Sequence, residues 1–132
     1  MGKRREIFRC NVCGQIIDVL NCGQGQLVCC DQPMEKLTEQ TADSTTEKHV
    51  PIVEQRDGKT YVKVGSVPHP MDEKHYIKWV EVQFEDGFAI KFLKPGEAPE
   101  KEFPFNMNEI TKAREYCSIH NLWASDSDLT NK

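Results

Sequence analysis

The histidines of this chain and one of its cysteines form a set of side chains that could bind a single redox-active metal. The chain has four histidines, and the only cysteine of its second half lies three residues before the last of them. The five candidate ligands are His49, His69, His75, Cys117 and His120. A structural zinc site uses four ligands in a closed tetrahedron, so this set is larger than such a site needs. Nitrogen-rich ligation with one sulfur and an open sixth position is typical of an iron that reacts with a small molecule.

Four other cysteines predict a second metal site. Cys10 and Cys13 are separated by two residues, whereas Cys29 and Cys30 are adjacent. Four thiolates suffice for a tetrahedral site that holds iron or zinc. Gly14 follows the first pair and lets backbone amides approach the sulfurs, while the adjacent pair has a restricted bite and predicts a distorted tetrahedron. A structural zinc site and a disulfide remain as alternatives at these positions.

Length and composition narrow the class of protein. The chain has 132 residues, a formal net charge of -4 and six cysteines. The acidic balance argues against a nucleic-acid partner, for which a basic face is expected. No apolar run is long enough to span a membrane, and the amino terminus lacks the features of a secretory signal. We therefore expect a cytoplasmic protein with reduced thiols, in which clustered cysteines bind metal. Cys22 is outside both sets and is expected to be a small packed or exposed residue.

The amino-terminal part, residues 1–37, predicts a small metal domain. It contains five of the six cysteines and little apolar material, so metal binding must contribute much of its folding free energy. Short strands are expected at 7–9, 15–20 and 26–28, with the glycine-rich residues 21–25 as a hairpin loop between the last two. Residues 38–46 are polar and lack a period, which predicts a linker or mobile loop.

The remainder, residues 47–132, predicts an all-β sandwich. Asp57-Gly58 lies between strand-like runs at 49–54 and 60–64, and Asp86-Gly87 lies between runs at 76–84 and 88–93. Asp-Gly between such runs is a strong hairpin signal, and successive hairpins favour a sandwich.

Local patterns in this part are clear in one run and ambiguous in others. Phe88, Ile90 and Phe92 alternate with their neighbours, so this run has one side that faces a core. The run at 76–84 alternates less well, which indicates a bulge. Residues 108–115 fit either a short helix or a strand that leads into a loop. The large aromatic side chains Trp79, Tyr116 and Trp123 are expected to pack in the core.

The combined motifs resemble those of a known family. The motifs are Glu47-Lys48-His49, Pro68-His69-Pro70, Glu73-Lys74-His75 and the Cys117/His120 pair, preceded by the four-cysteine domain. Together they closely resemble desulfoferrodoxin, the two-iron form of superoxide reductase, over nearly the whole chain. The resemblance implies a desulforedoxin-like (rubredoxin-type) domain with an Fe(Cys)4 centre, followed by an immunoglobulin-like β-sandwich that carries the active iron.

The resemblance also implies a role for each site residue. The four histidines would bind iron equatorially and Cys117 axially, Lys48 would attract superoxide, and Glu47 would close the sixth position of the ferric ion. The implied activity is one-electron reduction of superoxide to hydrogen peroxide by a homodimer, with a rubredoxin-like external electron donor. Two other functions stay open from the residues alone. They are a non-catalytic iron electron carrier and a zinc-stabilised binding module.

Overall fold

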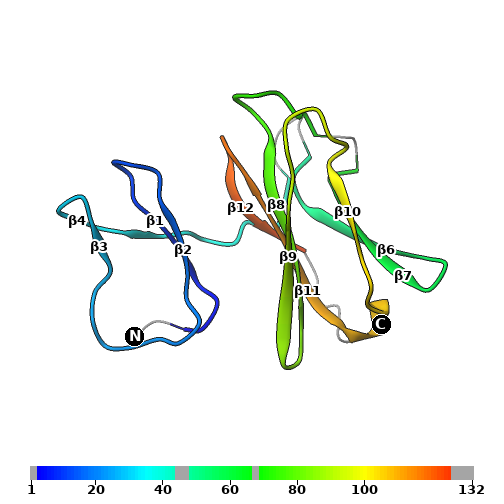
Figure 1. Ribbon diagram of the computed structural model, residues 1–132, viewed down its shortest axis with the longest axis horizontal. Helices are drawn as coiled ribbons and strands as arrows, with labels where there is room; N and C mark the ends of the chain where they lie inside the picture. The colour runs from blue at the N-terminus through cyan, green and yellow to red at the C-terminus, as the bar shows by residue number, and fades with distance from the viewer. Residues whose placement is uncertain (1–2, 44–47, 67–68, 126–132) are drawn as a thin grey trace. The chain divides into compact units, whose positions relative to one another are not determined.

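The chain consists of two units whose regular elements are almost all β-strands. The computed structural model describes residues 3–43, 48–66 and 69–125. The first unit is Met1–Thr38 and the second is Glu39–Lys132 (Figure 1). Within the described residues the only helical element is one 3-10 turn, which confirms the predicted all-β class. None of the described residues belongs to a helix that is long and apolar enough to cross a membrane.

The first unit contains two small sheets. Strands β1 (Ile7–Arg9), β2 (Ile16–Asp18) and β5 (Glu35–Lys36) form one sheet in the order β2-β1-β5, and β3 (Val28–Cys29) pairs with β4 (Gln32–Pro33). Because β2 and β3 belong to different sheets, the prediction that residues 21–25 are a hairpin loop is wrong. The buried apolar residues of this unit include Ile7, Met34 and Leu37. This small core leaves much of the stability to metal binding.

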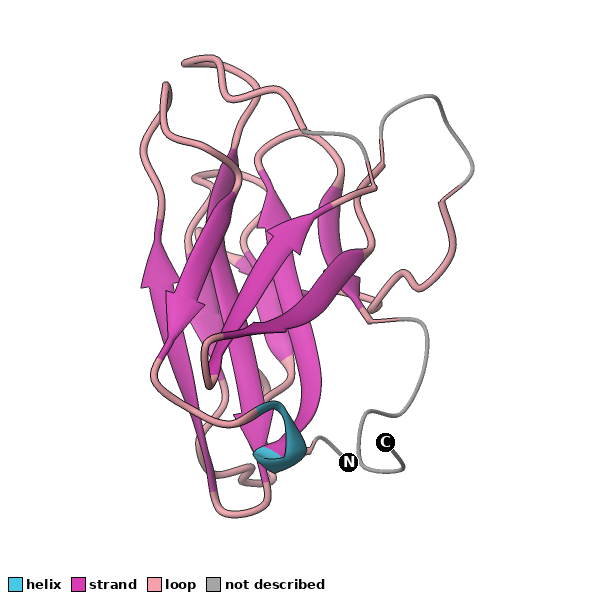
Figure 2. Ribbon diagram, turned by 90° about the vertical axis from the view of Figure 1, so that its right-hand side faces the viewer, coloured by secondary structure: helices cyan, strands magenta, loops and turns pink. Residues whose placement is uncertain are grey.

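The second unit is a sandwich of two antiparallel sheets (Figure 2). One sheet has the order β10-β7-β6 and the other has the order β12-β11-β8-β9. The strands are β6 (Pro51–Arg56), β7 (Lys59–Val64), β8 (Ile77–Phe84), β9 (Gly87–Phe92), β10 (Glu100–Phe103), β11 (Ile110–Cys117) and β12 (Asn121–Ala124). Both predicted hairpins are present, β6–β7 and β8–β9. Residues 57–58 form the first turn, whereas Glu85 and Asp86 form the second, with Gly87 already in β9.

The core lies between the two sheets. Val62, Val64 and Phe103 from one sheet meet Val80 and Val82 from the other. The predicted bulge in the 76–84 run is confirmed, because the register between β8 and β11 shifts next to Cys117. The predicted alternation in β9 exists, but the side that faces the core is that of Ala89 and Leu93. Phe92, on the opposite side, is 73% exposed.

The segment 108–115 is a strand and not a helix. A 3-10 turn at Met107–Glu109 is capped by Asn106, whose side chain accepts from the Asn108 N–H, and Glu109 bonds back to the Asn106 N–H. Strand β11 follows and pairs with β8 on one side and β12 on the other. Helix propensity is a weak prior, and pairing on both edges together with burial outweighs it here.

The residues just after Thr38 are attached to the sandwich. Glu39 forms ion pairs with Lys112 and Arg114 of β11, at 2.7 and 3.1 Å. Gln40 exchanges backbone hydrogen bonds with β12, accepting from Ala124 and donating to Leu122. Residues 39–43 of the predicted linker 38–46 therefore belong to the second unit. Residues 44–46 lie outside the described part of the chain.

Candidate metal centres

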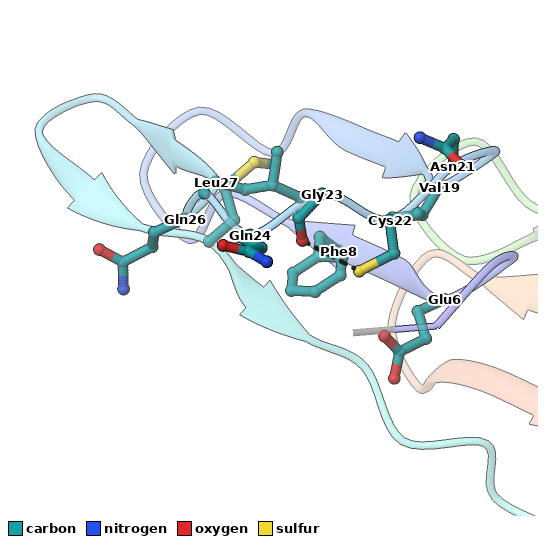
Figure 3. A pocket seen from close by; sticks show the side chains of 11 residues that line it. Glu6, Phe8, Val19, Asn21, Cys22, Gly23, Gln24, Gln26 and Leu27 are labelled. Carbon is teal, nitrogen blue, oxygen red and sulfur yellow. Dashed lines mark hydrogen bonds between the residues drawn. The ribbon is translucent and has the colours of Figure 1, made fainter. Parts of the chain in front are cut away.

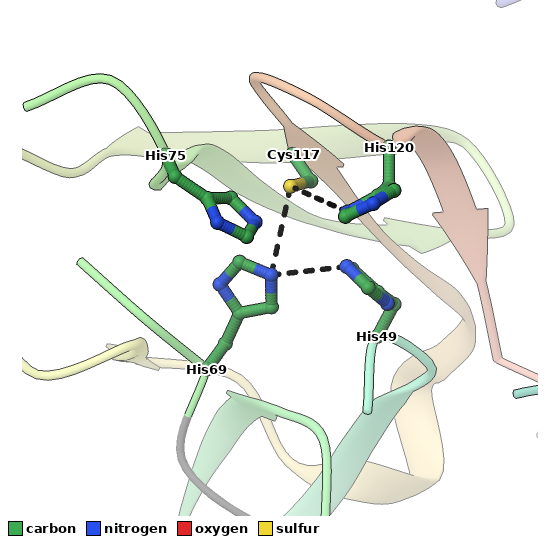
Figure 4. Close-up of side chains that lie close together, drawn as sticks. All are labelled: His49, His69, His75, Cys117 and His120. Carbon is green, nitrogen blue, oxygen red and sulfur yellow. Dashed lines mark hydrogen bonds between the residues drawn. The ribbon is translucent and has the colours of Figure 1, made fainter. Parts of the chain in front are cut away.

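Strand ends of both sheets bring the histidine and cysteine ligands together at one end of the sandwich (Figure 4). His49 precedes β6 and His69 follows β7, and these strands are paired so that the two positions lie at the same end. His75 precedes β8, Cys117 ends β11, and His120 lies in the turn from β11 to β12. The five predicted ligands, far apart in the sequence, thus form one group.

The distances within this group fit one metal ion. The Nε2 atoms of His49 and His69 are 3.0 Å apart, and the Cys117 Sγ lies 3.5 Å from the His69 Nε2 and 3.9 Å from the His120 Nδ1. One donor atom from each of the five residues lies within 4.8 Å of all the others. Two nitrogens bound at about 2.1 Å and at a right angle would be about 3.0 Å apart. The donor atoms therefore already converge as ligands of a common ion do.

Hydrogen bonds and ring stacking orient the imidazoles. The His69 Nδ1 lies 2.7 Å from the Pro70 carbonyl oxygen, and an N–H donated there leaves the Nε2 lone pair available to bind metal. The Trp123 ring stacks on His49 with centroids 4.6 Å apart, and its Nε1 donates to the His120 carbonyl at 2.9 Å. Gln40 Nε2 donates to the same carbonyl at 2.8 Å. Trp123 is buried as predicted, but it also contacts two ligand residues.

Two carboxyl groups near the site were not found from the sequence. The Asp43 Oδ1 accepts from the His49 N–H at 2.6 Å and from the Val50 N–H at 3.3 Å, which fixes the backbone that carries this ligand. Glu115 is fully buried, and neither of its carboxyl oxygens has a hydrogen-bond partner in the described chain. Burial raises the pKa of Glu115 well above its ordinary value, and the Asp43 carboxylate adds to this effect.

The two residues with predicted roles in catalysis precede His49. Lys48 is half-buried and directly precedes the candidate ligand His49 in the sequence. Glu47 lies outside the described residues, so its expected approach to the metal remains a prediction.

The four remaining predicted ligands converge in the first unit. The Sγ atoms of Cys13 and Cys29 are 3.6 Å apart, and those of Cys29 and Cys30 are 4.0 Å apart. The sulfurs of these residues and Cys10 lie within 4.8 Å of one another, which suits a tetrahedral thiolate site. Cys30 and Asp31 have φ angles of 54° and 60°, so the two-residue turn between β3 and β4 is left-handed and lets both adjacent thiols reach this site.

The backbone around Cys10 favours its thiolate. The Cys13 N–H points at the Cys10 Sγ at 3.4 Å, as expected from the predicted approach of amides to the sulfurs. Backbone N–H groups of Cys13 and Val12 lower the pKa of Cys10 to about 6. Hydrogen bonds to Cys10 and Cys13 raise the pKa of Cys29 to about 12. The backbone therefore favours ionisation of Cys10, whereas hydrogen bonds from the neighbouring cysteines oppose ionisation of Cys29.

Cys22 is separate from both sets of ligands. All six cysteines are free thiols. Cys22 is half-buried and donates to the Gly23 carbonyl oxygen at 3.4 Å. It lines a pocket of about 490 Å³ with Phe8, Leu27 and Met34, shown in Figure 3. None of the four clustered cysteines lines this pocket.

Both units are similar to known proteins. The "Desulfoferrodoxin" family profile matches residues 41–126, and "Desulfoferrodoxin, N-terminal domain" matches residues 2–37. A desulfoferrodoxin of Desulfarculus baarsii is 49% identical over 96% of this chain and all of its own length. A desulfoferrodoxin homolog of Methanothermobacter thermautotrophicus is 54% identical over 93% of this chain and 99% of its own.

A solved structure supports the same assignment. The superoxide reductase from Treponema pallidum superposes with a TM-score of 0.78 and 28% sequence identity, covering 94% of this chain and 99% of that one. This similarity extends over both units, as do the two family profiles. With both clusters of ligands in place and matches along nearly its whole length, the chain belongs to the desulfoferrodoxin family.

Proposed function

We propose that this protein is a superoxide reductase, which converts superoxide, one electron and two protons into hydrogen peroxide. The observation that carries the proposal is the convergence of four imidazoles and one thiolate at the end of the sandwich. Relatives in the same family support it, since the Treponema pallidum protein is named a superoxide reductase. Five donors around an octahedral ion leave one position for a small molecule.

The five clustered residues would hold the iron ion and tune its redox chemistry. Bound ferrous iron supplies the electron for the reduction. Cys117 belongs to the apolar core cluster, so its sulfur approaches the site from the dry interior. Electron donation from an axial thiolate is a means by which proteins tune iron. His75 and His120 are only half-buried, so water could reach an ion bound here, deliver both protons and carry away the product.

Lys48 is proposed to capture the substrate. The protein has a net charge of -4, which repels an anion, but this field is screened within about 8 Å at physiological salt. A local ammonium group one residue before His49 can therefore dominate close approach and raise the rate of encounter. Glu47 is proposed to occupy the sixth position of the oxidised iron, and its carboxylate would then leave when the iron is reduced again.

The test of this function is the stoichiometry of the products. Anaerobically reduced protein is mixed with a known amount of superoxide, and peroxide and molecular oxygen are both measured. Reduction yields one peroxide for each superoxide consumed, without matching release of oxygen. One oxygen for every two superoxide ions would show dismutation instead. A protein that is only an electron carrier, which is the competing proposal, would react slowly and give no saturable peroxide formation.

The proposal extends to partners and to the first centre. Each turnover uses one electron, so we propose a rubredoxin-like external donor, and the four-cysteine group is proposed to hold the second iron of the family. We further propose a homodimer in the cytoplasm, where six free cysteines would stay reduced. Light scattering on the iron-loaded protein tests the dimer, and a mass of 15.2 kDa would contradict it.

A further inference from the structure

Gly65, immediately after β7, lies directly against the backbone of Lys48. Its φ angle is +80°, and a Cβ atom at this position would be 2.8 Å from both the carbonyl carbon and the Cβ of Lys48. It would be closer still to the Lys48 carbonyl oxygen. These atoms are mostly main chain, so they cannot rotate away as the end of a flexible side chain could. Any larger residue at 65 must therefore displace the Lys48 backbone.

The segment next to this contact is held from a second direction. The Gly65 N–H donates to the Val50 carbonyl oxygen at 3.3 Å. The Asp43 carboxylate accepts from the His49 and Val50 N–H groups at 2.6 and 3.3 Å. Residues 48–50 are thus fixed by β7 through Gly65 and by the preceding segment through Asp43. His49 is additionally placed by the group of candidate ligands, and the contact with Gly65 acts on the main chain of Lys48.

We propose that Gly65 is a positioning residue for superoxide capture, because its lack of a side chain sets the place of Lys48 beside the iron. This inference rests on the proposed function, in which Lys48 attracts the anion. A side chain at 65 would move the Lys48 carbonyl while His49 stays bound to metal. A misplacement of about 1 Å can lower a rate by about 100-fold when geometry matters. The expected defect is therefore in capture, with both metals retained.

Gly58 provides a matched control for this substitution. Its φ angle is +79°, almost the same as that of Gly65, but a Cβ atom added there would meet none of the described residues within 4 Å other than its chain neighbours. Gly58→Ala therefore introduces the same left-handed strain without the collision. A difference in the rate of superoxide capture between Gly65→Ala and Gly58→Ala therefore reports the contact with Lys48. It does not report the general cost of alanine at positive φ.

The experiment compares Gly65→Ala, Gly58→Ala, Lys48→Ile and the double variant Lys48→Ile/Gly65→Ala, all loaded with iron. The second-order rate constant for reaction with superoxide is measured at several salt concentrations. Gly65→Ala should slow capture by about 10- to 100-fold and reduce its salt dependence, and Lys48→Ile should do the same. The double variant should be no slower than Lys48→Ile, and Gly58→Ala should match the unchanged protein.

A second measurement does not depend on activity. Hydrogen exchange, followed by mass spectrometry on a peptide that contains residues 48–50, reports whether these amides remain protected. Protection should fall in Gly65→Ala and persist in Gly58→Ala. Equal exchange in the two glycine variants would overturn the inference, as would loss of iron from the histidine site in Gly65→Ala, because Gly65 would then support the ligand and not Lys48.

The same set of variants separates this inference from the proposed function. If Lys48→Ile captured superoxide at the original rate, the proposed role of Lys48 would fail, and with it the inference. If Lys48→Ile were slow but Gly65→Ala behaved like Gly58→Ala, only the inference would be overturned. A double variant slower than either single variant would also contradict it, since Gly65 would then act by a route other than Lys48.

Discussion

Single residues outside the ligand set determine how the ligands of the sandwich site are held. His69 is oriented by the Pro70 carbonyl, and His120 by two donors to its own carbonyl oxygen, from Gln40 and Trp123. Such outer contacts fix the direction of a metal-binding ring and reduce the entropy that is lost when metal binds. The affinity of the site should therefore depend on residues that never touch the ion.

Trp123→Phe tests this dependence. Phenylalanine keeps an aromatic ring to stack on His49 but removes the N–H that donates to the His120 carbonyl. Loss of iron from the histidine site to a chelator should become about 10-fold faster. Trp79→Phe is the control, because Trp79 is also buried and stacks on Tyr116 without contacting a ligand ring. Equal rates of iron loss in the two variants would show that the indole N–H is dispensable.

At the level of elements, β11 organises the second unit. It pairs on both edges, its last residue is the cysteine ligand, and its Arg114 binds two carboxylates. Arg114 and Glu81 form a bidentate pair in which both side chains are almost fully buried, and Glu39 joins them from the residues after Thr38. One guanidinium group therefore connects β8, β11 and the first residue of the second unit.

Arg114→Met should strongly destabilise the sandwich. The substitution keeps an unbranched apolar stem but leaves the Glu81 carboxylate buried without its cation. We expect a loss of about 3–5 kcal/mol in the free energy of unfolding, measured by denaturant titration of the iron-loaded protein. Arg56→Met, which removes an exposed ion pair with Glu54, should change it little. A small effect of Arg114→Met would mean that Glu81 gains a proton or a water partner at low cost.

Metal binding by the loops of the first unit should depend steeply on pH. Cys10, with a pKa of about 6, is a thiolate at neutral pH, whereas Cys29 has a pKa of about 12 and hydrogen bonds to Cys13 and Cys10 raise that of Cys30. Metal binds thiolates, so at least the protons of Cys29 and Cys30 must leave. Apparent zinc affinity should then rise at least about 100-fold for each pH unit near neutrality. The dependence should become steeper below about pH 6, where Cys10 is protonated as well. Competition with a chelator measures this slope, and a slope of one proton or fewer contradicts the assignment.

The sequence predicted the two groups of candidate ligands and the two Asp-Gly hairpins better than it predicted the local strands. Ligand identity and the Asp-Gly signals are properties of single positions, so they could be recognised without a structure. Strand β11 could not be distinguished from a helix, because its propensities are overridden by pairing on both edges. Asp43 and Gly65 were missed for a similar reason, since their importance comes from contacts with residues 48–50 that only the fold creates.

At the scale of the whole molecule, the two centres belong to units with separate cores. The four-cysteine ligands all lie within Met1–Thr38, and the histidine ligands and Cys117 all lie within Glu39–Lys132. None of the described residues contributes to both sets. Each unit also has its own sheets, with no described strand shared between them. Reduction of superoxide at the second centre should therefore survive loss of the first.

Cys13→Ser tests this independence. Removing one of four thiolates should abolish the iron absorption of the first centre and leave the second with its full iron content. Pre-reduced variant protein should still reduce superoxide at nearly the original rate, because none of the residues of the sandwich site has changed. Cys22→Ser is the control, since it removes a thiol outside both sets and should preserve both iron signals. If pre-reduced Cys13→Ser no longer reacted rapidly with superoxide while pre-reduced Cys22→Ser did, the first centre would be required for the reduction itself. A selective defect in steady-state turnover with an electron donor would instead show that electrons reach the second iron through the first.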